Sequence, residues 1–259
     1  MKLNIVPART GIVWVKLGIQ TFFRQPLALS GLFFMFMAVM SVATLLPLIG
    51  NALALALLPA CTLGLMAATQ EATKGKFPMP SILISAFRAG QQRMQAMLVL
   101  GALYAAGFLL VMGISALIDG GEFAKLYLVG GKLTREKAMA PEFQAAMWVA
   151  MGLYLPLSLL FWHAPALVHW HGVPPVKSLF FSAVACMRNF WAFTVFGLVW
   201  VAVFVIVGMV VTTLAAVIGS PVAASVTMVP AAMLMAAMFF TSLYFTFRDS
   251  FEAAPDPQP

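Results

Sequence analysis

Charged residues are scarce in this sequence: Asp, Glu, Lys and Arg together make up 9% of its 259 residues, whereas a soluble domain carries about 25%. Hydrophobic residues make up 63%, and the mean hydropathy is +0.98. A soluble fold of this size has too little interior to hide so much apolar surface from water. We therefore predict an all-α integral membrane protein. The net charge of +7 does not indicate a nucleic-acid partner, because its meaning depends on where the positive residues lie.

Residues that commonly carry chemistry are also few. Cys61 lies in an apolar run and Cys186 in a basic segment, so we expect neither a disulfide nor a shared metal site. The sequence contains no P-loop and no nucleophile elbow. No predicted span carries a charged residue near its centre, whereas ion pumps and proton-coupled carriers usually do. The sequence therefore predicts no catalytic residue, no metal site and no cofactor, and we do not expect an enzyme.

Long uncharged runs predict six membrane-spanning helices, because a helix of about 20 apolar residues crosses a bilayer. The first run lies between Arg24 and Glu71 and is interrupted at residues 47–51, so it predicts a hairpin of two spans. The predicted spans are residues 26–47, 49–70, 95–117, 144–168, 191–217 and 221–245. They form a single polytopic domain over residues 1–252, followed by a disordered polar tail at 253–259.

Positive residues gather on one side of the predicted membrane. Eleven of the 15 Lys and Arg residues lie near the two termini or in the connections 71–94 and 171–190. The 118–143 connection carries four positive and four negative residues, a mixture more typical of a solvated loop than of a cation site. The positive-inside rule therefore predicts that both termini are cytoplasmic. Because Lys2 and Arg9 interrupt the apolar pattern, we expect no cleaved signal peptide.

A polar stripe runs along each of three segments that precede the first, third and fifth spans. The segments and their polar residues are 11–25 (Lys16, Gln20, Arg24), 81–93 (Ser81, Ser85, Arg88, Gln92) and 177–189 (Ser178, Ser182, Asn189). Such amphipathic helices lie in the interface plane with their apolar side in lipid. Alternatively, the segments are the solvated ends of tilted spans.

Each amphipathic segment precedes a hairpin whose second span carries a proline near its middle. We infer three copies of one unit, an in-plane amphipathic helix plus a helical hairpin, at about 10–75, 80–172 and 175–250. The equivalent prolines are Pro59, Pro156 and Pro230. Because proline kinks a helix and frees a backbone carbonyl, the three kinks either widen a central cavity between the repeats or improve packing.

Three stretches carry a resemblance to a known family: VPARTGIVWVKLGIQTFFRQPLAL, HGVPPVKSLFFSAVACMRNFWAF and YFTFRDSF. Over nearly its whole length the chain resembles a family of uncharacterised six-span inner-membrane proteins of betaproteobacteria. The repeated unit is more distantly similar to the membrane domain attached to some bacterial glycerophosphodiester phosphodiesterases. The resemblance implies an inner-membrane location and supplies no catalytic motif.

All three histidines lie within FWHAPALVHWHG, residues 161–172. On one continuous helix, His163, His169 and His171 point in different directions, so they cannot together ligate one zinc ion. Trp170 lies at the expected end of the fourth span, where aromatic rings gather beside headgroups. We therefore interpret His169, Trp170 and His171 as an interfacial anchor. A single haem, metal or headgroup contact through His163 or His171 is the alternative.

Positive residues beside the amphipathic segments either contact anionic headgroups or only determine the topology. They are Lys16, Arg24, Arg93 and Arg188. The sequence predicts a non-catalytic inner-membrane protein with an accessory or organising role that binds lipid, another membrane protein or a second copy of itself. The first alternative is a passive permease or lipid-handling protein with a cavity between the three repeats. The second is a haem- or metal-binding membrane protein that uses His163 or His171.

Overall fold

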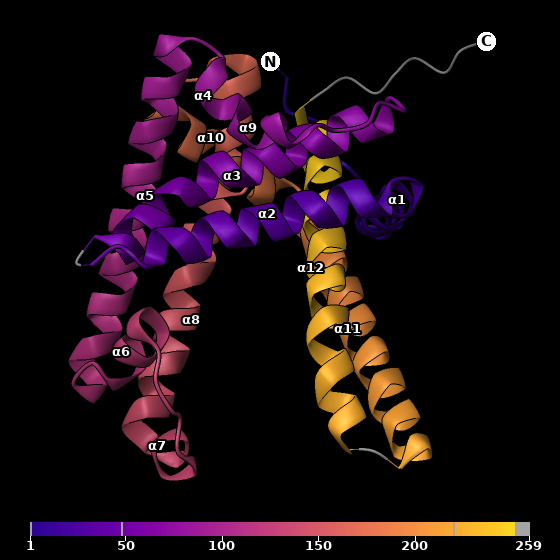
Figure 1. Ribbon diagram of the computed structural model, residues 1–259. Coiled ribbons are helices and arrows are strands. Elements are labelled where there is room, and N and C mark those ends of the chain that lie inside the picture. The colour runs from indigo at the N-terminus through magenta and orange to yellow at the C-terminus, as the bar shows by residue number, and fades with distance from the viewer. Residues whose placement is uncertain (1, 48, 220, 252–259) are drawn as a thin grey trace. The chain divides into compact units, whose positions relative to one another are not determined.

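The computed structural model describes residues 2–47, 49–219 and 221–251 (Figure 1). In these residues the backbone forms helices and no β-strand, which confirms the predicted all-α class. The elements are α1 (Thr10–Arg24), α2 (Pro26–Thr44), α3 (Gly50–Thr73), the 3-10 helix η1 (Pro80–Ile84), α4 (Ser85–Arg88), α5 (Gln91–Asp119), α6 (Glu122–Val129), α7 (Arg135–Met139), α8 (Pro141–Phe161), α9 (Ala164–His171), α10 (Pro175–Arg188), α11 (Phe190–Ile218) and α12 (Pro221–Phe251).

Six helical stretches within the described ranges are long and apolar enough to cross a membrane. They are Pro26–Thr44, Gly50–Thr73, Gln91–Asp119, Pro141–His171, Phe190–Val217 and Val226–Phe251. Each predicted span overlaps one of them, which confirms six candidate spans in the predicted order within the described residues. The predicted polar tail at 253–259 lies outside the described residues.

The chain divides into two compact units, and each unit combines segments that are distant in sequence. The first contains the described parts of Met1–Met37, Thr62–Ser85 and Val184–Pro259, and the second contains Ala38–Cys61 and Ala86–Ala183. The first predicted repeat contributes residues to both units. The threefold repeat stays a prediction, because the compact units group residues by contact and not by sequence correspondence.

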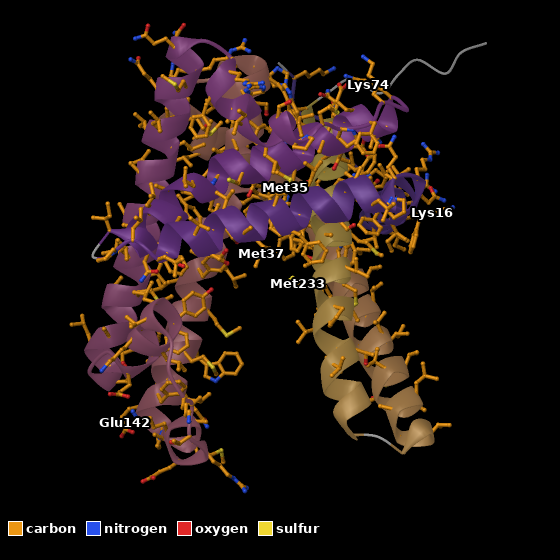
Figure 2. The ribbon with its side chains drawn as sticks, in the orientation of Figure 1. Lys16, Met35, Met37, Lys74, Glu142 and Met233 are labelled. Atoms are coloured by element: carbon orange, nitrogen blue, oxygen red, sulfur yellow. The ribbon has the colours of Figure 1, made fainter. Side chains whose placement is uncertain are left out.

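In the first unit, the amphipathic helix α1 is separate from the span that follows it. It ends at Arg24 because Gln25, the residue before a proline, avoids the helical conformation, and α2 begins at Pro26. The predicted stripe of Lys16, Gln20 and Arg24 is exposed, and Figure 2 shows Lys16 pointing away from the ribbon. α1 is thus separate from the following span and exposes these three polar residues, whereas its in-plane amphipathic position stays a prediction.

The opposite face of α1 lies against α11 and α12. A side-chain carbon at Gly11 would collide with the backbone of Ala192, and one at Gly18 would lie 2.5 Å from the Cβ atom of Ser242. Glycine at these two positions therefore lets α1 approach both helices closely. Much of the apolar face that the sequence predicted to lie in lipid is instead covered by protein.

The N-terminal segment of the first unit is held by hydrogen bonds from α12 and from the start of α11. The indole Nε1 of the fully buried Trp14 donates to Oδ2 of Asp249 at 2.9 Å. The side chain of Asn189 accepts from the Val6 N–H at 2.8 Å and donates to the carbonyl oxygen of Asn4 at 3.0 Å. Asn189 was predicted to face water, and this pairing with backbone groups explains why it is buried.

The predicted amphipathic helix over residues 81–93 is not continuous. The segment forms η1 and the four-residue α4, and Gly90 then adopts φ +96°, a left-handed conformation that side-chain-bearing residues rarely take. The chain turns there and α5 begins at Gln91, so Arg93 lies in the first turn of a span. The prediction of one in-plane helix is wrong for this segment because Gly90 interrupts it.

In α10 the polar side faces the protein. Ser178 and Ser182 are fully buried, whereas Phe180 and Met187 are 62% and 69% exposed. α10 is a separate helix as predicted, but the interpretation of its polar stripe as water-facing is wrong. The serine hydroxyls instead bond to carbonyl oxygens within the protein.

The fourth span is not one continuous helix, because α8 ends at Phe161 and α9 begins at Ala164. Pro165 in the first turn of α9 lacks an N–H and its ring disfavours helix through the preceding turn. Ser182 bridges the bend: its hydroxyl donates to the Leu159 carbonyl at 2.8 Å and accepts from the His163 N–H at 2.9 Å. An uninterrupted α-helix would pair these two backbone groups directly.

The three prolines predicted to kink spans lie inside helices that continue on both sides of them. Pro59 is inside α3, Pro156 inside α8 and Pro230 inside α12. The break in the fourth span lies beyond Pro156, at residues 162–163. The expectation of a single continuous helix through the three histidines is therefore wrong. Pro165 is the physical cause of the break between α8 and α9.

Candidate functional site

A groove lies in the second unit where α5 begins and α9 ends. Its volume is about 730 Å³, and its lining includes Gln92, Arg93, Gln95, Val168, Val173 and Lys177. We call it the basic groove. The candidate span Gln91–Asp119 begins beside the basic groove, and the candidate span Pro141–His171 ends beside it.

Local sequence explains how the basic groove forms. α9 ends at His171, and the φ of +64° at Gly172 then allows the chain to turn out of the helix. Pro175 then begins α10, since proline suits the first helical turn. The short connection places Lys177 in the wall that faces the first turns of α5. The Ser182 bridge one turn further along α10 holds this helix against the bend between α8 and α9.

The basic groove carries positive charge and no negative side chain among its lining residues. Arg93 and Lys177 are both exposed. No side chain caps the N-terminus of α5, which begins after Gly90. The first N–H groups of a helix have no partner within it, and the helix dipole makes this end positive. Two cations and a helix N-terminus therefore meet at one apolar-walled groove.

The structure brings several of the predicted interface residues to this end of the second unit. Arg93 lines the basic groove and lies within electrostatic reach of His169. The ring of His169 lies edge-on to Trp170, with centroids 6.2 Å apart, and His171 is exposed. The other predicted residues, all exposed, lie in the first unit: Lys16, Arg24 and Arg188. The four predicted positive residues thus do not form one cluster within a unit.

His163 lies in the bend between α8 and α9, and its side chain is fully buried. A haem iron would reach it only if the surrounding helices moved apart. His171 is exposed at the end of α9. Within the described parts of the chain, no three residues of the His, Cys, Asp and Glu types come close enough together to hold a metal ion. Cys61 and Cys186 are both buried.

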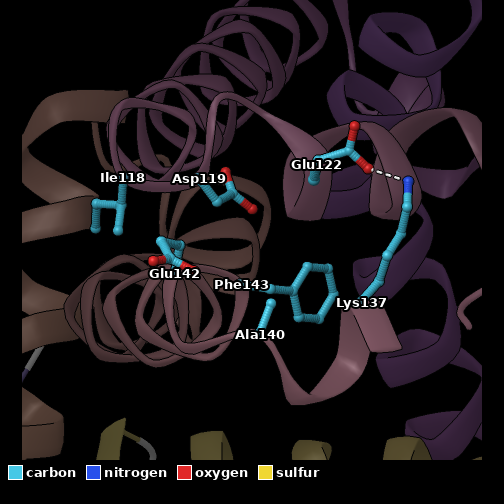
Figure 3. A pocket seen from close by; sticks show the side chains of 7 residues that line it. All are labelled: Ile118, Asp119, Glu122, Lys137, Ala140, Glu142 and Phe143. Carbon is cyan, nitrogen blue, oxygen red and sulfur yellow. Dashed lines mark hydrogen bonds and ion pairs between the residues drawn. The ribbon is translucent and has the colours of Figure 1, made fainter. Parts of the chain in front are cut away.

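A second pocket, of about 390 Å³, lies at the opposite end of α5, beside α7 and the start of α8 (Figure 3). The Glu122 carboxylate forms an ion pair with Lys137. This hydrogen bond and the lysine charge hold the pKa of Glu122 below its ordinary value. The carboxylate of Asp119 accepts hydrogen bonds from the N–H groups of Gly121 and Phe123, where α6 begins. These two carboxylates therefore support the local backbone and the contact between α6 and α7.

Sequence reasoning missed Lys177 as a groove residue and Ser182 as a bridge. The relevant signal was the run of Gly172, Pro174 and Pro175, which predicts a short, sharp connection between two helices. That signal does not show which helix faces Lys177, because α5 lies about eighty positions earlier in the chain.

Comparisons with known proteins agree with the membrane architecture. No protein-family model matches the chain, and no solved structure matches it. Over 254 residues, the chain is 42% identical to a probable inner membrane protein of Burkholderia thailandensis, and the alignment covers 97% of this chain and 94% of its relative. The chain belongs to this family of inner-membrane proteins. The predicted multi-pass inner-membrane character is confirmed, whereas the distant resemblance to the phosphodiesterase membrane domain stays a prediction.

Proposed function

We propose that this inner-membrane protein is non-catalytic and that it binds phospholipid at the basic groove, in an accessory or organising role. The observation that supports this proposal is that Arg93 and Lys177 line the same groove, beside the ends of two candidate spans. Lipid headgroups lie at this depth of the bilayer, and basic pockets between spans suit their phosphates. The guanidinium and ammonium groups would pair with phosphate oxygens.

The apolar part of the groove suits the rest of a phospholipid. Ala96 and Val99 follow Arg93 along one side of α5, and Val168 faces them from α9. Val99 is 49% exposed although it lies inside a span, so a lipid chain would cover it. A headgroup held by Arg93 would place its acyl chains along this side of α5.

The distribution of positive residues supports a cytoplasmic position for the basic groove and for both termini. Reporter fusions test this orientation. A reporter inserted at residue 130, between α6 and α7, is expected to behave as exported, and one fused after residue 251 as cytoplasmic. A cytoplasmic reporter at residue 130 would reverse the orientation, and the groove would then face the other leaflet.

Lipid retention tests the proposed function. We expect native mass spectrometry of gently extracted protein to show about one tightly held phospholipid per chain, and we expect the double variant Arg93→Gln/Lys177→Gln to lose it. The matched control, Lys132→Gln/Arg135→Gln, removes the same charge from exposed positions at the far end of the second unit. Equal retention by both double variants would overturn the proposal. A protein partner retained without lipid would overturn it in favour of protein recruitment.

A further inference from the structure

We infer that the basic groove selects anionic phospholipid with a glycerol-type headgroup over zwitterionic phosphatidylethanolamine. This inference rests on the proposed function and narrows its ligand. Every phospholipid offers a phosphate and acyl chains, so Arg93 and the apolar walls alone do not discriminate. Selection depends on what the groove offers to the group beyond the phosphate.

The lining residues of the groove offer no carboxylate to an ammonium group. A headgroup ammonium carries only hydrogen-bond donors and a positive charge, so it is satisfied best by a carboxylate. None of the lining residues is Asp or Glu, and Arg93 and Lys177 both carry positive charge. An ethanolamine headgroup would bring a third positive charge beside these two. The groove thus disfavours the zwitterionic lipid by repulsion and by leaving its ammonium without an acidic partner.

A glycerol headgroup finds suitable partners in the same place. Gln92 and Gln95 line the groove beside Arg93, and each amide both donates and accepts hydrogen bonds, as a hydroxyl requires. The uncapped start of α5 adds backbone N–H donors for the phosphate. The net negative charge of such a lipid is attracted by both cations and by the positive end of the helix dipole.

Competition in a bilayer tests the selection. The full chain would be placed in nanodiscs holding equal amounts of phosphatidylglycerol and phosphatidylethanolamine with identical acyl chains, and native mass spectrometry would identify the lipid that stays bound. We expect phosphatidylglycerol to be enriched on the order of thirtyfold, since each Lys or Arg near the surface favours anionic lipid by about 1 kcal/mol and about 1.4 kcal/mol corresponds to a factor of ten. Arg93→Gln/Lys177→Gln should bring the ratio close to one, and Lys132→Gln/Arg135→Gln should leave it unchanged.

The outcomes separate this inference from the proposed function. If both lipids are retained equally and both are lost in the Arg93→Gln/Lys177→Gln variant, the groove binds lipid without selection and only the inference is overturned. If retention does not depend on Arg93 and Lys177, the proposed function fails as well. Adding cardiolipin identifies the source of the anionic headgroup: enrichment of cardiolipin over phosphatidylethanolamine also supports selection of an anionic glycerol-type lipid. Both exchanged side chains are exposed, so these variants leave the packed core intact.

Discussion

Ser182 accepts a hydrogen bond from the backbone N–H of His163 at 2.9 Å. The same hydroxyl donates to the Leu159 carbonyl, so one side chain of α10 replaces a backbone hydrogen bond that the fourth span lacks. The wall of the basic groove formed by the end of α9 and the start of α10 depends on this bridge, because it fixes α10 against the bend. Ser182 is a positioning residue for the groove and does not line it.

Removing this bridge should destabilise the protein. Ser182→Ala removes the hydroxyl that bonds to the buried N–H of His163 and to the part-buried carbonyl of Leu159, and we expect a loss of about 1–3 kcal/mol in the free energy of unfolding. Ser178→Ala is the matched control, because Ser178 is equally buried but bonds only to Pro175 within its own helix. Thermal unfolding in detergent would compare the two variants. An equal loss of stability in both would contradict a special role for Ser182.

Two glycine substitutions should have opposite effects on stability. α12 packs closely against α1 at Gly18, whereas nothing lies near Gly31 in α2. In Gly18→Ala the new methyl group would lie 2.5 Å from the Cβ atom of Ser242, so overpacking should cost about 1–3 kcal/mol in the free energy of unfolding. In Gly31→Ala the methyl group meets nothing within 4 Å, and alanine should raise helix stability by up to about 1 kcal/mol. The same unfolding assay measures both. A neutral Gly18→Ala variant would show that α1 is not packed this tightly.

The orientation of α10 is open to thiol labelling. Cys186 is 2% exposed and burial raises the pKa of its thiol to about 12, so it should react slowly with maleimide at neutral pH. A cysteine placed at the neighbouring Met187, which is 69% exposed, should react quickly. The comparison requires Cys61→Ala in both proteins and Cys186→Ala in the Met187→Cys protein. Fast labelling of Cys186 would contradict the buried polar side of α10.

The Glu122–Lys137 ion pair predicts that the stability contributed by Glu122 changes with pH only in the acidic range. Because the lysine lowers the pKa of Glu122 in the folded protein, the pair contributes stability above the ordinary glutamate pKa of about 4.3. That contribution is lost as the pH falls through the lowered value. An NMR titration of the Glu122 side chain should give a midpoint below the ordinary value, and Lys137→Met should raise it again. An unchanged midpoint in Lys137→Met would contradict the ion pair.

The six spans and the separate helix α1 were predictable because their signals are local. Hydropathy marks the apolar runs, and Pro26 ends α1 wherever it packs. The orientation of α10 was not predictable in the same way. Serines at positions 178 and 182 define one side of a helix, but the spacing does not show whether water or the protein's own backbone satisfies them. The answer depends on the bend near Pro165, which packs against α10 and offers backbone groups to the hydroxyl of Ser182.

The candidate site was predictable only in part. Arg93 was expected at the membrane surface because the positive-inside pattern is visible in the sequence. Its position in one groove with Lys177 depends on how α5 packs along α8 and α9. The sequence does not reveal this packing, because the residues involved are far apart in the chain. The structure also separates Arg93 from Arg24 and Arg188 by unit, although the sequence suggested three equivalent positions.

The measurement that tests the central claim most directly is the number of phospholipids retained per chain, counted by native mass spectrometry in the wild-type protein and in Arg93→Gln/Lys177→Gln. Binding at the basic groove predicts about one retained phospholipid in the wild type, its loss in this variant and its persistence in Lys132→Gln/Arg135→Gln. Retention that is the same in all three proteins would contradict lipid binding at the basic groove.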